Sequence, residues 1–570
     1  MRSVLKTASF AVVSWAAAAI LGSAPAVAGE HHRDNHPVAG TYLSGDFHQH
    51  TYYTDGGTTF TNVMQKSDFY DLDWWANSEH GGSRQQDGNN HRWTDPLYYP
   101  TNPILGDVSG APQVMWRWQS LRDYVFPDIQ AARLLYPTKE IFSGLEWNVP
   151  GHEHCSTGIV ADDAAAISAF EFIFDASDND TSRIGEVTAY GTPAKTNGKT
   201  YTGPGAWTDK SYPDRHLDAV AGCAWMQAQK DAGTIEDGWI VFAHVERDGP
   251  WIADDGGGYN IEHFRDFNNA GPDVCFGFEG APGHQTSKDR GGFGMTAFGG
   301  TWGGAGYYTA AVGGLWDALL GEGRRYFNFA SSDFHSYATG FEKGGGDFHP
   351  GEYQRDWVYV EDADKDGDYS QAEIAEGMRS GNSFHVMGDL VTELQFTAQA
   401  GHGKKVPMGG SLLVPRGEGI DLTIRFKSPA TNTCPDFVGS HDCAPPVVDH
   451  IDLIAGEITG KKQPGTPEYT MASNPSTRVL KTFTAADWTV DTEGYNVINY
   501  RIRKPEKDMY FRLRGTNLAP NTPCETDPAG NPLPDFVASS CYGSTFDGPR
   551  EAYADLWFYT NPIFTDVNGR

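Results

Sequence analysis

Short apolar segments that run into potential metal ligands recur along the first two-thirds of the chain. The first ends at Gly45 and is followed by His48 and His50. In a strand, residues i and i+2 share a face, so the two imidazoles are expected to aim at one point. Later segments repeat the pattern: 72–76 before His80, 141–145 before Glu146, 239–243 before His244, and 326–330 before Asp333 and His335. This recurrence favours a shared metal site.

Helical periodicity fills the stretches between these segments, as at 217–232 and 309–320. Strands that alternate with helices are typical of a parallel sheet, and an α/β barrel keeps its active site at the carboxyl ends of its strands. We expect a barrel over residues 41–388, because ligands from at least four strands must converge on one point. An open, doubly wound sheet is the alternative.

The pattern changes to short alternating segments from residue 389 to residue 570. Proline, glycine and asparagine turns separate them, which is typical of an all-β domain, most simply a sandwich. We expect this domain to act as a lid or packing partner for the barrel. The expected strands are 392–398, 420–426, 450–454, 495–502, 509–513 and 552–559.

The N-terminus carries the features of an export signal. Arg2 and Lys6 precede an apolar run over 8–22, and Ala26-Val27-Ala28 gives a small-x-small cleavage pattern. We therefore expect a signal peptide over 1–28, a polar leader over 29–40, and a mature protein in the periplasm or outside the cell. The apolar run is short for a membrane span, so no retained membrane anchor is expected.

The formal net charge is −31. An acidic surface repels phosphate backbones, which argues against nucleic acid as the main partner. Seven cysteines in an oxidising compartment predict disulfides. The expected pairs are Cys434 with Cys443, Cys524 with Cys541 and, on weaker grounds, Cys223 with Cys275, which leaves Cys155 as a buried thiol.

Residues 362–373 fit the calcium-binding loop pattern, with Gly367 at position 6. The candidate ligands are Asp362, Asp364, Asp366, Asp368, Ser370 and Glu373. Only 372–379 looks helical and 357–360 looks like a strand, so a whole helix-loop-helix hand is not expected. A structural calcium ion would hold the loop, and a solvated acidic turn is the alternative.

The candidate ligands, taken in order, resemble the signature of the polymerase and histidinol phosphatase (PHP) family. That signature runs HxH, then Asp-Gly, an acid-His pair, a Glu after a strand, and further His positions that end in D-x-H. Counterparts are His48, His50, Asp55, His80, Glu146, His154, His244, Asp333 and His335. The resemblance covers residues 41 to about 390. It implies a distorted (β/α)7 barrel that holds two or three divalent metal ions.

The resemblance also implies how the ligands are shared among the ions. The first metal would be held by His48, His50, Glu146 and Asp333, the second by Glu146 with His154 and His244, and the third by Asp55, His80 and His335. Two positions depart from a simple match. Glu79 stands where the family usually has Asp, and His152 competes with His154 as the ligand after Glu146.

Imidazole and carboxylate ligands suit Zn, Mn or Fe(II). Such ions lower the pKa of a bound water, and a metal-bridging hydroxide can then attack phosphorus in line. Arginine often pairs with phosphate oxygens, and Arg84 and Arg247 follow His80 and His244 closely enough to do so. A surface salt bridge is the alternative for each arginine. The candidate general acids are Glu79, His152 and His216.

These patterns predict an exported metal-dependent phosphoesterase that acts on a small organic phosphate. A phosphodiesterase is favoured over a phosphomonoesterase, because long loops rich in Gly, Trp and Tyr suggest a roomy aromatic pocket. The alternatives are an amidohydrolase-like enzyme and a non-catalytic binding protein. The oligomeric state is not indicated.

Overall fold

The structure, a computed structural model, describes most of the chain. The described residues are 40–106, 113–191, 212–247, 249, 257–287, 290–291, 300–337, 346–431, 445–535 and 548–567, with the backbone of 195–196 and 199–200. The expected signal peptide and most of the polar leader lie outside the described residues. So do Cys434, Cys443 and Cys541.

The expected strand ends belong to one row of seven strands, in the order β11-β10-β9-β6-β5-β2-β1. Their bounds are β1 Thr41–Asp46, β2 Trp74–Asn77, β5 Glu140–Asn148, β6 His154–Val160, β9 Asp237–Phe242, β10 Gly277–Ala281 and β11 Phe327–Ala330. Most residues of these strands are buried. The four strands expected from residues 72, 141, 239 and 326 onward are confirmed.

The row is mixed, so the expectation of a parallel sheet is wrong in part. β6 pairs antiparallel with both β5 and β9, whereas the other neighbours in the row are parallel. The antiparallel pairing of β6 with β5 is explained by the segment between residues 148 and 154. A short turn joins β5 to β6 there, and a chain that reverses without a crossover helix must form an antiparallel pair.

The two ends of the row approach each other just beyond β1 and β11. Gln49 and Phe334 form an isolated parallel bridge, and the His50 N–H donates to the Phe334 carbonyl at 2.8 Å. The segment after β1 therefore lies beside the segment after β11. This contact brings residues that are far apart in the sequence to one place.

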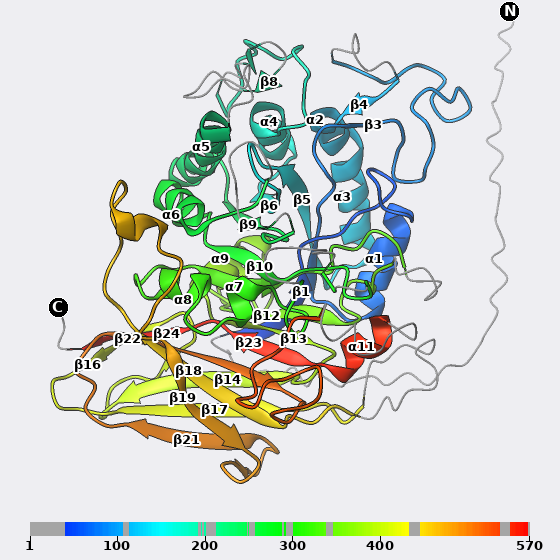
Figure 1. Cartoon of the computed structure of the whole chain (residues 1–570). Helices are drawn as coiled ribbons and strands as arrows, with labels where there is room; N and C mark the ends of the chain where they lie inside the picture. The colour runs from blue at the N-terminus through cyan, green and yellow to red at the C-terminus, as the bar shows by residue number, and fades with distance from the viewer. Residues whose placement is uncertain are drawn as a thin grey trace, which may run out of the picture. The chain divides into compact units, whose positions relative to one another are not determined.

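Helices pack around this row (Figure 1). They are α1 Phe60–Phe69, α2 Arg117–Ser120, the π-helical turn η1 Leu121–Val125, α3 Phe126–Leu135, α4 Ala165–Phe174, α5 Tyr212–Asp231, α6 Ile261–Ala270, α7 Tyr307–Ala310 and α8 Leu315–Leu320. Their starts follow from local chemistry: Thr59 caps α1 by accepting the N–H of Asn62. The short strands β3 Ser83–Arg84 and β4 Met115–Trp116 form one two-stranded sheet, and β7 Lys195–Thr196 and β8 Lys199–Thr200 form another.

Two expected elements differ from the structure. The helix expected over 309–320 is split into α7 and α8, because Gly313 adopts φ +81°, a left-handed conformation that interrupts the helix. The strand expected over 552–559 begins as the helix α11, Gly548–Ala554, and only Trp557–Thr560 forms the strand β23.

The same sheet continues into the C-terminal region through β12 and β13 to β23, β22, β18 and β19. Five further strands form a separate antiparallel sheet, β15-β14-β17-β21-β20. The bounds are β12 Gln354–Val360, β13 Ser383–Met387, β14 Glu393–Ala400, β15 Val406–Pro407, β16 Ser411–Val414, β17 Ile420–Lys427, β18 His450–Glu457, β19 Arg478–Thr484, β20 Thr489–Val490, β21 Asn496–Ile502, β22 Met509–Thr516 and β24 Ile563–Val567, with a 3-10 turn at Pro467–Thr470. Apolar residues of both sheets share one buried cluster.

The described residues form one compact unit, and the boundary expected near residue 388 stays a prediction. The barrel-side helix α8 is held to β22 by a buried ion pair. Both carboxylate oxygens of Asp317 accept hydrogen bonds of 2.8 Å from Arg512, and the Tyr510 hydroxyl donates to the same carboxylate at 3.0 Å. The expected C-terminal β-structure is thus tightly joined to the row that carries the candidate ligands.

Cysteine chemistry follows the expectation in part. Cys155 is a buried free thiol, as expected. Cys223 and Cys275 are also buried free thiols, so their expected disulfide is wrong. Cys524 is disulfide-bonded, and its partner lies outside the described residues. Among the described residues, no helix combines the length and apolar character needed to cross a membrane.

Candidate metal centre

Every one of the nine candidate ligands lies at one end of the strand row. His48 and His50 follow β1, His80 follows β2, Glu146 lies near the end of β5, and His154 begins the antiparallel β6. The remaining ligands are His244 after β9, Asp333 and His335 after β11, and Asp55 in the turn that follows His50. Because these strand ends meet at one edge, residues from six strands reach one point.

The innermost group consists of His48, His50, Glu146 and Asp333, all of them buried. The Asp333 Oδ1 atom lies 3.2 Å from His48 Nε2 and 3.3 Å from His50 Nε2. The Glu146 carboxylate approaches the same two rings at 3.3 Å and 3.1 Å. Two imidazoles and two carboxylates therefore face a common point.

The Glu146 carboxylate is shared between groups. Its Oε1 atom also lies 3.0 Å from His154 Nδ1 and 3.0 Å from His244 Nε2, and its Oε2 atom lies 2.8 Å from His80 Nδ1. Five imidazoles thus surround one buried carboxylate. A carboxylate in this position is placed to bridge neighbouring cations.

A third group lies at the solvent side. Asp55 approaches His80 Nε2 and His335 Nε2, each at 3.4 Å, and His50 belongs to the same group. The Asp55 side chain is 42% exposed, so this group forms the outer edge of the centre. It has the composition of a third cation site beside the two that share Glu146.

The donor atoms fit divalent metal ions. Glu146 Oε2, Asp333 Oδ1 and His154 Nδ1 are buried and have no well-oriented hydrogen-bond partner among the described residues, although oppositely charged groups lie within 4 Å. A metal ion is bound by donor atoms that point to one place and whose lone pairs are not already used in hydrogen bonds. Mixed imidazole and carboxylate donors suit Zn, Mn or Fe(II).

The charges of the centre depend on one another. Burial alone would lower the pKa of His48, but the carboxylates of Asp333, Glu279 and Glu146 raise it well above its ordinary value. Burial would likewise raise the pKa of Asp333, yet His48 and His284 hold it well below the ordinary range. The carboxylates therefore stay ionised, the form in which they bind metals.

Four groups around the centre were missed by the sequence interpretation. Glu279 Oε1 lies 2.9 Å from His48 Nδ1, and Glu153 Oε2 lies 3.4 Å from His244 Nδ1. His284 contacts Asp333 Oδ2 at 3.0 Å and Asp347 Oδ1 at 2.6 Å. His284 follows the strand β10 and so repeats the pattern of a strand that runs into a histidine, a signal that could have identified it.

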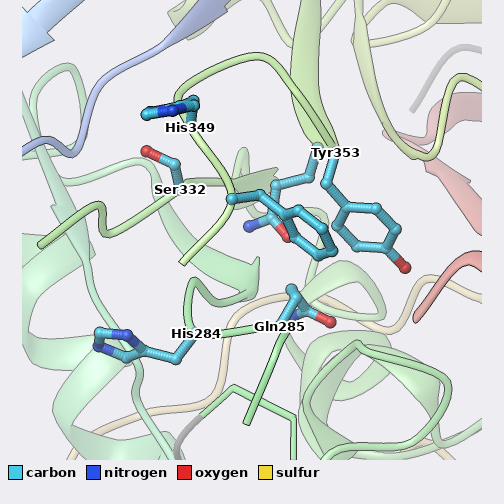
Figure 2. Close-up of a pocket in the computed structure, with 7 residues that line it drawn as sticks. His284, Gln285, Ser332, His349 and Tyr353 are labelled. Atoms are coloured by element: carbon cyan, nitrogen blue, oxygen red, sulfur yellow. The ribbon is translucent and has the colours of Figure 1, made fainter. Parts of the chain in front are cut away.

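A small cavity adjoins His284 (Figure 2). Its lining includes Gln285, Ser332, His349 and Tyr353, and Ser332 precedes Asp333 in the chain. The Nδ1 atom of His349 has no hydrogen-bond partner among the described residues. Through Ser332, the cavity lies next to the strand end that carries Asp333.

The candidate catalytic residues lie in three different settings. Arg247 reaches the centre, where its Nη2 atom lies 3.1 Å from Asp333 Oδ2. Glu79 is buried and accepts hydrogen bonds from the hydroxyls of Thr51 and Thr54, so it supports the turn that follows His50. Arg84 Nε donates to the Thr54 carbonyl at 2.7 Å.

The remaining two candidates, His152 and His216, belong to a different cluster. His152 Nε2 and His216 Nδ1 lie 2.9 Å apart, and the two rings form a group with His263. His154, and not His152, is the histidine that faces Glu146.

The expected calcium loop is an exposed turn between β12 and the helix α9, Gln371–Ser380. Asp362 accepts the Gly367 N–H at 3.1 Å, and Glu373 accepts the N–H groups of Ala363 and Ser370 at 2.7 Å and 2.9 Å. Ser370 and Glu373 also form the capping box of α9. The loop is therefore folded around its own carboxylates, and calcium binding stays a prediction.

Comparison with known proteins gives little. No protein-family model matches the chain, and no curated protein matches it. One solved structure that is similar is described as a two-domain protein containing a predicted PHP-like metal-dependent phosphoesterase, from Bacteroides vulgatus ATCC 8482. It shares 12% identity with a TM-score of 0.29, covering 83% of this chain and 91% of that chain. A likeness of this degree says nothing about the reaction.

Proposed function

We propose that the protein is a metal-dependent phosphoesterase of the PHP type. The observation that carries the proposal is the position of Glu146, a buried carboxylate with imidazoles on both of its oxygens. The ordered resemblance of the nine ligands to the PHP signature points the same way. Divalent ions bound there would supply Lewis-acid polarisation of phosphoryl oxygens and lower the pKa of a coordinated water.

The metals would be held by the groups described above. His48, His50, Glu146 and Asp333 form the first set, Glu146 with His154 and His244 the second, and Asp55 with His80 and His335 the third. His80 spans two sets, because its two ring nitrogens face Glu146 and Asp55. The chain thus fixes neighbouring cation positions with one continuous set of donors.

Arg247 and His284 are placed to bind the anionic substrate. Both approach the same atom, Asp333 Oδ2, at 3.1 Å and 3.0 Å, and their side chains are 26% and 23% exposed. They therefore border the centre on a side that solvent can reach. A guanidinium can pair with two phosphate oxygens at once.

His284 adds a second donor. Burial would lower its pKa, but Asp347 and Asp333 raise it to about 10. The ring is then an imidazolium whose Nε2–H is directed to the edge of the centre, since Nδ1 is held by Asp347. This proton can be shared with a phosphate oxygen.

Diesters are the favoured substrate class. Apart from the candidate metal ligands, Arg247 and His284 are the two basic groups that the described residues place on Asp333, and a diester carries a single negative charge. A monoester dianion commonly demands more cations. Hydrolysis of monoesters and amidohydrolase-like cleavage of C–N bonds are the alternative activities, and a non-catalytic binding role is the alternative to catalysis.

Four further parts of the proposal rest on the sequence. The protein is proposed to be exported, to act on a small molecule and not on nucleic acid, and to carry no membrane anchor. The loop 362–373 is proposed to bind calcium as a structural ion. Neither export nor calcium binding takes part in the proposed chemistry at the centre.

A panel of three chromogenic substrates tests the proposed reaction. Bis(p-nitrophenyl) phosphate, p-nitrophenyl phosphate and p-nitroacetanilide are offered to protein loaded with Mn, Zn or Fe(II). The proposal predicts the highest kcat/KM for the diester. If the monoester is hydrolysed faster than the diester, the proposed diester preference is wrong. If only the anilide is hydrolysed, the proposed phosphoesterase activity is wrong.

A further inference from the structure

Three histidines outside the metal centre form a second cluster. His152 lies in the turn between β5 and β6, His216 lies on α5, and His263 lies on α6. One ring nitrogen of each lies within 4.8 Å of the other two, and the rings of His216 and His263 are buried. None of these residues belongs to the groups around Glu146 and Asp55 described above.

The hydrogen bonds fix where the lone pairs of His152 and His216 point. His152 Nδ1 lies 3.1 Å from the Gly258 carbonyl, which can only accept, so the ring proton of neutral His152 is on Nδ1. His216 Nε2 lies 3.2 Å from Asp266 Oδ2 and donates to that carboxylate. Each ring therefore has its other nitrogen free of a proton in the neutral form.

Those two free nitrogens face each other. His152 Nε2 and His216 Nδ1 are 2.9 Å apart. Two lone pairs at this distance repel unless both nitrogens share a cation. That cation is either an extra proton on the line between them or a metal ion beside that line, since zinc–nitrogen bonds are about 2.0–2.1 Å long. The outer hydrogen bonds to a carbonyl and a carboxylate are the partners that metal-binding histidines usually have.

We propose that His152 Nε2 and His216 Nδ1 together bind one divalent ion of the zinc class, at a site separate from the catalytic centre. Imidazole nitrogens suit this class of ion, and water would complete its coordination. The carboxylate of Asp266, which contacts His216, gives the site a negative charge that offsets the positive charge of nearby Arg215. His152 is partly exposed, so an ion can reach the site from solvent.

His263 forms a wall of the site. Its Nδ1 atom accepts the Asn260 N–H at 3.0 Å and completes the capping box of α6, so its proton is on Nε2. The ring lies 4.5 Å and 4.6 Å, between centroids, from those of His152 and His216. Tyr259 stacks on His152 at 4.8 Å and closes another side.

The proposed ion would tie the β5–β6 turn to α5. His152 lies two residues before His154, which faces Glu146. The Tyr259 hydroxyl, whose ring packs on His152, donates at 3.0 Å to the carbonyl of either Glu153 or His154. An ion at His152 would therefore hold the segment that presents a catalytic ligand.

Zinc stoichiometry of the full chain tests the site. Metal-stripped protein is titrated with Zn²⁺, and bound zinc per chain is counted for wild type, His216→Ala and His91→Ala. His91 is a matched control because it is partly exposed and its ring contacts Asp87. We expect His216→Ala to bind one zinc ion fewer than wild type and His91→Ala to bind the same number.

Asp266→Asn should keep the ion but weaken its binding at least about tenfold, because the outer hydrogen bond is lost. An unchanged zinc count in folded His216→Ala would overturn the proposal and identify the short contact as a protonated pair. If His216→Ala does not fold, anomalous diffraction of wild-type crystals soaked in zinc decides. A peak between the two rings supports the site, and its absence at saturating zinc overturns it.

Discussion

His48 Nδ1 lies 2.9 Å from Glu279 Oε1, and both side chains are fully buried. Glu279 also accepts hydrogen bonds from Ser156 at 2.8 Å and Ser331 at 2.7 Å, so its carboxylate is held in place. The contact keeps a proton of His48 on Nδ1, so that Nε2, which faces Asp333, is the nitrogen that would bind a metal ion. Glu279 is thus a positioning residue for the metal centre.

Replacing Glu279 with glutamine should weaken metal binding at the centre. The amide can no longer accept on both of its polar atoms, so His48 loses its fixed orientation. We expect metal affinity to fall about 10- to 100-fold, as is common for such outer partners. Competition with a chelator of known affinity measures this change.

Asp237→Asn is the matched control for that experiment. Asp237 is a buried carboxylate at the other end of β9, paired with Arg379. Its loss should lower stability without changing metal affinity. Equal loss of affinity in both variants would show that Glu279 acts through general stability, not through His48.

Arg247→Ala should lower kcat for a phosphodiester. Its guanidinium lies at the edge of the centre, and removing one donor to a developing negative charge costs about 10²- to 10³-fold in kcat. Arg247→Lys should recover only part of the rate, because lysine lacks the planar fork. Arg84→Ala serves as the control and should retain nearly full activity, since Arg84 donates to the Thr54 backbone.

Much of the centre could be predicted because most of its ligands lie at or just after the end of a short apolar strand. The positions of Glu146, His244 and Asp333 at strand ends are visible in the sequence, and the fold brings those ends together. The antiparallel orientation of β6 could not be predicted from the sequence pattern. A buried strand shows the same alternation and burial of its residues whether it pairs parallel or antiparallel. Glu279 was missed because it lies inside a buried strand, where only the three-dimensional register shows that it meets His48.

Glu352 gives a pH dependence of stability. Burial raises the pKa of Glu352 to about 7, against an ordinary value of 4.5. The folded protein then binds a proton that the unfolded chain has already released, so stability is full below about pH 4.5 and falls as pH rises to about 7. We expect a loss on the order of 1–3 kcal/mol across this window.

Glu352→Gln should remove this dependence, because the amide does not titrate. Unfolding by denaturant at pH 5 and pH 8 measures it. The difference in unfolding free energy between the two pH values should be smaller in the variant than in wild type. An equal difference in both proteins would assign the pH dependence to other groups.

Calcium should stabilise the loop 362–373. We expect a rise in Tm when calcium is added to chelated protein, since binding to the folded state adds to stability. Glu373→Gln should abolish the rise while keeping the start of α9, because glutamine also forms a capping box. Glu376→Gln, a change outside the loop, should keep it. A rise that persists in Glu373→Gln would place the calcium elsewhere.

The most direct test of the central claim is metal content measured together with diesterase activity. The purified protein is analysed for bound transition metals, and turnover of bis(p-nitrophenyl) phosphate is followed before chelation, after chelation and after metal is restored. The account predicts two or three transition-metal ions at the centre, in addition to any zinc at His152 and His216, and a diesterase activity that chelation abolishes and metal restores. A folded protein that binds calcium alone and hydrolyses neither diester nor monoester would contradict it.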